Sequence, residues 1–166
     1  MRWVGTATAA IILGAGACSD SVSSVPDLEA DIAVATPELE YHWDNLEPGN
    51  GLAIQALLTN QGTRSYYARL GDAFNAMDEQ SVLFVATGSD AFLDRAVSSE
   101  WAPVERATLI EGVKVVALTP GSTYTLMTYF LGGNTTGTFR LRVQYMTSPD
   151  SGEITGEAVS PPFEIH

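Results

Sequence analysis

The sequence contains very little positive charge. Lys114 is its only lysine, and the eight Lys and Arg residues stand against 20 Asp and Glu residues, which gives a formal net charge of −12. Contacts with nucleic-acid phosphates or with bare anionic lipid depend on Lys and Arg side chains. The composition therefore predicts that no nucleic acid is a partner of this chain.

Cysteine and histidine are equally scarce. Cys18 is the only cysteine, and His42 and His166 are the only histidines. One thiol cannot form an internal disulfide, and the His and Cys clusters of zinc sites are absent. No nucleophile elbow, P-loop or dinucleotide fingerprint occurs either. We predict a protein that is not an enzyme, with no catalytic residues and no cofactor.

Two local groups of residues could still carry chemistry. His42 lies two residues from Asp44, but without a nucleophile the pair is better explained by a surface histidine on the first strand, with Trp43 in the core. Oxygen-rich residues 44–50, including Asp44 and Glu47, could bind Ca²⁺, but their spacing does not match an EF-hand loop. We predict no metal site.

The first 17 residues have the three parts of an export signal. Arg2 is followed by an uncharged stretch from Val4 to Ala17, which ends in small residues before Cys18. As a helix, these residues would rise only about 21 Å, against a hydrocarbon core of about 30 Å. We therefore predict a signal peptide at residues 1–17 and no membrane-spanning segment.

Two processing routes fit this signal. The small residues at 15 and 17 suit ordinary cleavage, which would release a soluble secreted or periplasmic protein. The stretch Leu13–Cys18 resembles a bacterial lipobox, although Ala15 stands where Leu is usual. The resemblance implies a lipoprotein with palmitate-type lipid on Cys18, held on the membrane of the bacterial cell envelope. Ser19 after the cysteine implies the outer membrane where the organism has one.

Residues 18–35 are rich in Ser and acidic residues and have no sustained hydrophobic period. Such a segment cannot bury enough apolar surface to offset its ordering entropy, so we predict an acidic tether. The alternative is an edge strand over Leu28–Ala35.

From Leu52 onward the hydrophobic pattern has period two, which is typical of strands. The apolar runs Ser81–Ala86 and Val113–Leu118 suit strands buried on both faces. Thr123–Phe130 and Phe139–Met146 are predicted to pair as a hairpin through residues 131–137. Residues 91–98 could form a helical turn or two, or a strand.

The predicted register of the strand at 139–146 follows from its charges. Phe139, Leu141 and Val143 alternate with Arg140 and Arg142, so we expect the apolar set in the core and the arginines against solvent or an acidic neighbour. Replacing the second arginine should then cost less than about 1 kcal/mol.

The ends and aromatic residues of the strands carry further signals. Pro161-Pro162 cannot donate to a sheet, so Val159–Ile165 should be an edge strand or contain a bulge.

Tyr66 and Tyr67 are adjacent, as are Tyr129 and Phe130, so one ring of each pair should face outward. Exposed rings of this kind suit a protein or glycan partner.

Several short phrases resemble the corners of bacterial immunoglobulin-like domains. They are Leu58–Gly62, Leu118–Ser122, Gly137–Leu141 and Val159–Ile165. The resemblance, which extends to the BsuPI-type proteinase-inhibitor domain, implies an all-β, immunoglobulin-like antiparallel β-sandwich over residues 36–166. We expect a lipid-anchored envelope protein with a non-enzymatic binding or assembly role. The alternative is a proteinase inhibitor that acts through a mobile loop at residues 71–80 or 148–156.

Overall fold

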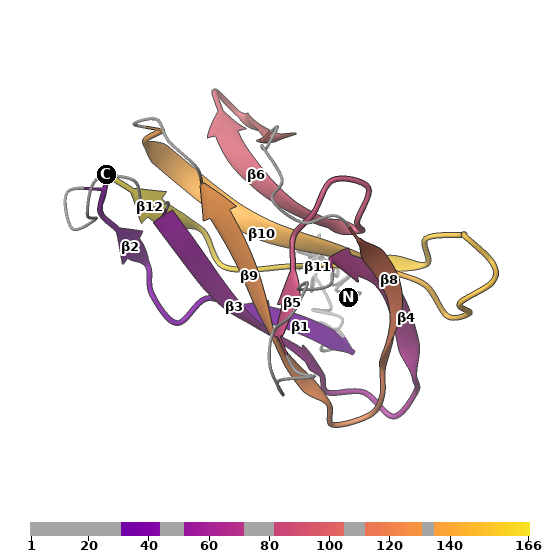
Figure 1. Ribbon diagram of the computed structural model, residues 1–166. Helices are drawn as coiled ribbons and strands as arrows, with labels where there is room; N and C mark the ends of the chain where they lie inside the picture. Colours follow the sequence, from indigo (N-terminus) through magenta and orange to yellow (C-terminus); the bar gives the residue numbers. More distant parts are fainter. Residues whose placement is uncertain (1–30, 44–51, 72–81, 105–111, 131–134) are drawn as a thin grey trace, which may run out of the picture.

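The computed structural model describes residues 31–43, 52–71, 82–104, 112–130 and 135–166, which form two β-sheets (Figure 1). In spatial order, sheet A contains β1 (Ile32–Ala35), β3 (Leu52–Asn60), β9 (Thr123–Phe130), β5 (Val82–Phe84), β4 (Tyr66–Gly71) and β8 (Val113–Leu118). Sheet B contains β2 (Glu40–Tyr41), β12 (Phe163–Ile165), β10 (Gly137–Tyr145), β6 (Ala91–Val97) and β7 (Glu100–Pro103), with β11 (Gly156–Val159) also paired to β10.

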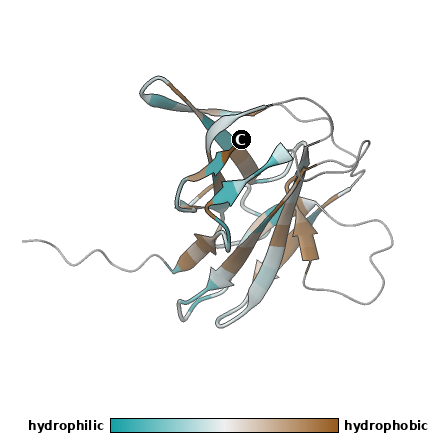
Figure 2. Cartoon of the chain, turned by 90° about the vertical axis from the view of Figure 1, so that its left-hand side faces the viewer, coloured by the Kyte–Doolittle hydropathy of each residue, from teal (hydrophilic) through white to brown (hydrophobic). Residues whose placement is uncertain are grey.

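The two sheets share one hydrophobic core. Ile54, Leu126, Leu93 and Leu141, two from each sheet, are fully buried within it. In Figure 2, brown hydrophobic stretches occur along strands of both sheets, interspersed with white and teal ones. The predicted class, an all-β immunoglobulin-like sandwich, is confirmed. Among the described residues there is no helix of the length and apolarity needed to cross a membrane.

The sheets are mixed rather than purely antiparallel. β5 pairs with β9 in parallel, and β12 pairs with β2 in parallel, whereas the other strand pairs are antiparallel. Parallel neighbours need a crossover connection, so turn signals between consecutive strands could not predict them.

The hairpin predicted from the two alternating segments near the C-terminus is wrong. β9 lies in sheet A between β3 and β5, while β10 lies in sheet B beside β6, β11 and β12. Consecutive strands in a sandwich often cross from one sheet to the other, and both alternation and turn residues look the same in the two cases.

Two other predictions need correction. Ile32–Ala35, assigned to the tether, forms β1 and pairs with β3, as the edge-strand alternative described. Val113–Leu118, predicted to be buried on both faces, is β8 at the edge of sheet A, where Val113 and Val115 are exposed. An apolar run does not distinguish a central strand from an edge strand whose outer face is itself apolar.

The predicted register of β10 is confirmed. Phe139, Leu141 and Val143 have no exposed surface, and Arg140 and Arg142 face the other side. Pro161-Pro162 separates β11 from β12, which pair with different halves of β10, so the expected interruption occurs there. Residues 91–98 do not form a helix, because Ala91–Val97 is β6.

Asn60 joins two loops that cross at one end of sheet A. Its Nδ2 donates to the carbonyls of Arg64 and Leu118, both at 2.7 Å, and its Oδ1 accepts from the amide of Gly62 at 2.9 Å. Its backbone bonds to Ser122 and Gly121 in the next turn. Because Asn60 is 1% exposed, water cannot replace these bonds.

We predict that Asn60→Ala lowers the free energy of unfolding by about 2–4 kcal/mol, because it removes the buried hydrogen bond to the Leu118 carbonyl and the two further bonds of the Asn60 amide group. Thr59→Ala, at the neighbouring position, should cost less than about 1 kcal/mol, since its hydroxyl bonds only to the exposed Thr123 hydroxyl. Urea denaturation of both variants measures the difference. Equal losses would contradict the role given to Asn60.

Candidate binding surface

The outer face of sheet A, called here the apolar face, carries almost no charge. Strand register and alternation identify its described residues. They are Ala33, Ala35, Ala53, Gln55, Leu57, Thr59, Tyr67, Arg69, Gly71, Val82, Phe84, Val113, Val115, Ala117, Thr123, Thr125, Met127 and Tyr129. None of these is acidic, although the whole chain has 20 acidic residues.

Several large side chains of the apolar face are open to solvent. Leu57 is 46% exposed, Val115 47% and Tyr129 38%. The rings of Phe84 and Tyr129 stack with their centroids 5.9 Å apart and their planes 19° apart. A stacked pair of this kind presents rigid apolar area at a low entropic cost, as binding surfaces do.

The one cation on the apolar face is neutralised. The guanidinium of Arg69 donates to the Asp90 carboxylate at 2.6 Å, and Asp90 is buried. This hydrogen bond raises the pKa of Arg69, which favours the charged form of its guanidinium beside the carboxylate. The apolar face is therefore close to electrically neutral in a strongly acidic molecule.

The outer face of sheet B has the opposite character. Its described outward residues include the carboxylates of Glu40, Asp94, Glu157 and Glu164, and two arginines on β10. The acidic side chains of the described strands therefore lie on sheet B, and the described outer face of sheet A has no carboxylate.

Asp94 lies at the centre of a compact ionic cluster on sheet B. Arg142 donates to its carboxylate at 2.8 and 3.1 Å, and Arg140 approaches at 3.4 Å. Each guanidinium also lies over an aromatic ring, Arg142 over Phe92 and Arg140 over Trp101, both 4.4 Å from the centroid. These side chains cover Asp94, which is 1% exposed although it points away from the core.

Of the two alternatives expected for Arg140 and Arg142, solvent or an acidic neighbour, the structure has the second, and the neighbour is Asp94 of β6. Its hydrogen bond raises the pKa of Arg142. The small cost predicted for replacing Arg142 is revised, because removing it would leave a buried carboxylate with one distant partner.

We predict that Arg142→Ala costs about 2–3 kcal/mol of unfolding free energy. Arg95→Ala, a matched change on β6, should cost less than about 1 kcal/mol, because Arg95 donates to the exposed carbonyl of Thr136. In a double-mutant cycle, Asp94→Ala should recover part of the Arg142→Ala loss. Additive losses in the cycle would show that the two side chains are not coupled.

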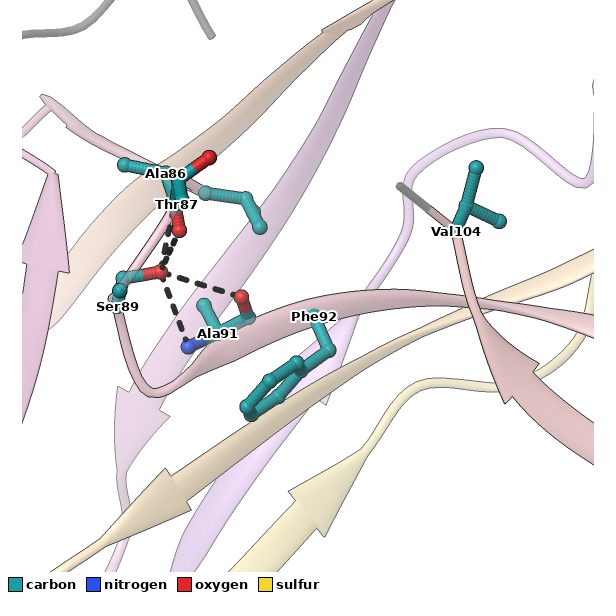
Figure 3. Close-up of a pocket in the computed structure, with 8 residues that line it drawn as sticks. Ala86, Thr87, Ser89, Ala91, Phe92 and Val104 are labelled. Carbon is teal, nitrogen blue, oxygen red and sulfur yellow. Dashed lines mark hydrogen bonds between the residues drawn. The ribbon is translucent and has the colours of Figure 1, made fainter. Parts of the chain in front are cut away.

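A cavity of about 390 Å³ lies beside the turn between β5 and β6 (Figure 3). Val85, Ala86, Ala91, Phe92 and Val104 provide apolar walls. The only hydroxyl that Figure 3 shows in hydrogen bonds there is that of Ser89, which bonds to backbone atoms of the flanking residues 86 and 91. This hydroxyl therefore stabilises the turn.

The other sequence candidates fall in different places. His42 is exposed and stacks on His166 at 5.1 Å, and Trp43 packs against the core, as expected. Tyr67 and Tyr129 face outward on sheet A, as predicted for one ring of each pair. Cys18 and residues 44–50 lie outside the described residues.

The two loops considered for a proteinase inhibitor are described to different extents. In the first, only Gly71 lies among the described residues, as the end of β4. In the second, Ser151 accepts the amide of Glu153 and donates to the carbonyl of Ser148. This part of the loop is folded as a turn.

No family model matches the sequence, and no curated protein matches it. Solved structures similar to this chain include PapD-like domain 7 of human CEP192 (12% identity, 81% of this chain and 82% of that chain, TM-score 0.38). Another is the N-terminal domain of PorA, with 10% identity over 81% of this chain and 96% of that chain and a TM-score of 0.37. A third is the Pseudomonas fluorescens DNA glycosylase AlkC bound to DNA, with 12% identity over 82% of this chain and 31% of that chain and a TM-score of 0.35. These similarities carry no argument about function.

Proposed function

We propose that this chain is a non-enzymatic binding domain, anchored to the bacterial envelope by lipid on Cys18, and that it binds a protein partner through the apolar face. One observation carries the proposal. Exposed Leu57, Val115 and Tyr129 form part of a sheet surface whose described residues include no carboxylate, in a chain of net charge −12. Exposed apolar patches on acidic, soluble domains mark interaction sites.

A protein partner fits this surface better than a small ligand does. The apolar face spans neighbouring strands from β3 to β8. Small molecules bind in concave sites that bury most of their surface, whereas protein interfaces place aromatic and aliphatic side chains in a broad central patch. The described cavity beside Phe92 is not part of the apolar face, because it lies at the turn before β6.

The non-enzymatic part of the proposal rests on how the buried polar side chains are used. Asn60, Asp90, Asp94 and Ser89 each bond to groups that hold strands or turns together. Catalysis needs polar groups that are poised toward a substrate. The side chains of these four described residues instead stabilise strands and turns.

The proposed anchor lies close to sheet A along the chain. Asp31 is fixed to β4 by accepting the hydroxyl proton of Tyr66, and its carbonyl accepts the amide of Gln61 at 2.7 Å. The 13 steps from Cys18 to Asp31 would reach about 45 Å when fully extended. A lipid on Cys18 would therefore keep the domain within one molecular diameter or so of the membrane.

We predict that Cys18→Ala abolishes labelling with radioactive palmitate and moves the protein from the membrane to the soluble fraction, because the acyl chains supply the membrane affinity. Cys18→Ser, which replaces only the thiol with a hydroxyl, is the closest isosteric control for the loss of the acylated group. Fractionation and labelling of both variants measure the effect. Unchanged membrane partition would remove the lipoprotein proposal and leave ordinary secretion.

We predict that a photo-reactive amino acid at position 57 or 129 forms a cross-linked adduct with a partner in intact cells, because both positions are exposed on the apolar face. The matched control is position 159, where Val159 is 37% exposed on sheet B. Immunoblotting after irradiation compares the three positions. Adducts from position 159 alone, or from all three at equal yield, would contradict the proposed surface.

A further inference from the structure

Five described strands pair with a neighbour on one side only, and four of these are protected against further pairing. β11 has four residues and contains Glu157. β2 has two residues and contains Glu40. β7 begins with Glu100 and ends with Pro103. β1 has four residues and shares a groove with Glu157 of β11. Short length, proline and charge are the usual means by which edge strands avoid pairing with other chains.

β8 has none of these features except one lysine. Its sequence is Val-Lys-Val-Val-Ala-Leu, six residues without proline, glycine or carboxylate. It pairs with β4 on one side and ends the order of sheet A on the other. Val113 and Val115 on this strand are 40% and 47% exposed. An edge strand of this length and composition is a template for an added strand.

We propose that β8 pairs antiparallel with β8 of a second copy of this chain about a two-fold axis. The pairing would join the two A sheets into one continuous sheet. It would also bring the two apolar faces together into a single surface with Val113 and Val115 at its centre. It requires neither the lipid on Cys18 nor a partner on the apolar face.

The chemistry of β8 favours a second copy as the occupant. Opposed residues of antiparallel strands point to the same face, which allows symmetric registers centred on Val115 or on Val116. Lys114 would then lie opposite Val116 or Leu118 of the second copy, never opposite its own counterpart. No carboxylate of either strand enters the contact, although each chain carries a net charge of −12.

The net charge gives this pairing a distinctive salt dependence. Two chains of net charge −12 repel each other, and salt screens that repulsion. Dimerisation through β8 should therefore strengthen as salt rises from about 0.05 to 0.5 M. A complex between this acidic chain and a basic strand would weaken over the same range.

Disulfide trapping tests the pairing directly. In a Cys18→Ala background, Val115→Cys should form a cross-linked dimer on mild oxidation if the register centres on Val115. An equimolar mixture of the Val115→Cys and Ala117→Cys variants reports the register centred on Val116. Leu57→Cys is the control, because Leu57 is similarly exposed on the same face but lies on β3. We expect the β8 cysteines to cross-link at least tenfold faster than the control, and equal or absent cross-linking would overturn the pairing.

Sedimentation velocity of the unmodified sequence keeps the proposal testable if a cysteine variant does not fold. The dimer fraction should rise with salt. Val115→Lys should shift the chain to monomer, whereas Leu57→Lys should leave the dimer fraction unchanged. The proposal would be overturned if the chain stays monomeric at high protein concentration at both ends of the salt range. A dimer that dissociates as salt is added would also overturn it.

Discussion

The joined arrangement of the two sheets depends on the buried carboxylate of Asp90. Its oxygens accept the backbone amide of Arg69 at 2.8 Å and the guanidinium at 2.6 Å, while its own amide donates to the Arg69 carbonyl at 2.7 Å. Its carbonyl accepts the amide of Gln144, at 2.8 Å. Arg69 belongs to sheet A and Gln144 to sheet B, so one residue fixes the corner where the sheets meet. The bridge between Tyr67 and Met146 closes the same corner. Charge-assisted hydrogen bonds of this kind are stronger than those between neutral groups.

This constraint also determines the surface of the molecule. Because Asp90 pairs with Arg69 from beside β4, the cation on the apolar face is neutralised. On the opposite sheet, Arg140 and Arg142 lie in a cluster with Asp94 that is covered by Phe92 and Trp101. Arg142 also pairs with Glu157, so two carboxylates stand against two guanidinium groups. Sheet B therefore presents a polar surface on which the two arginines of β10 are paired with carboxylates. Sheet A presents apolar side chains that are exposed to solvent. An acidic domain can stay soluble with one such face and still offer it to a partner.

Period-two alternation predicted the sandwich and the core positions of β10, because core burial selects the register of a strand. For the arginines of β10 it left solvent and an acidic neighbour as alternatives. It did not predict which strands pair. Alternation and turn residues are local, whereas the separation of β9 from β10 into different sheets is decided by long-range packing. Asp94 was missed because a lone Asp inside residues 91–97 gives no sign that it will be covered. The apolar face could have been recognised from the sequence of the strands. Every strand of sheet A lacks Asp and Glu, and every strand of sheet B except β10 contains one.

The central claim is that sheet A is the face covered by a partner in the envelope and sheet B is not. Hydroxyl-radical footprinting tests it most directly, because Met127 and Tyr129 on sheet A and Trp101 on sheet B are all reactive side chains. Oxidation of each would be compared between native membranes and the purified protein at a concentration where it is monomeric. The account predicts that Met127 and Tyr129 are protected severalfold in membranes while Trp101 is unchanged. Protection of Trp101 with Met127 and Tyr129 unchanged would contradict it.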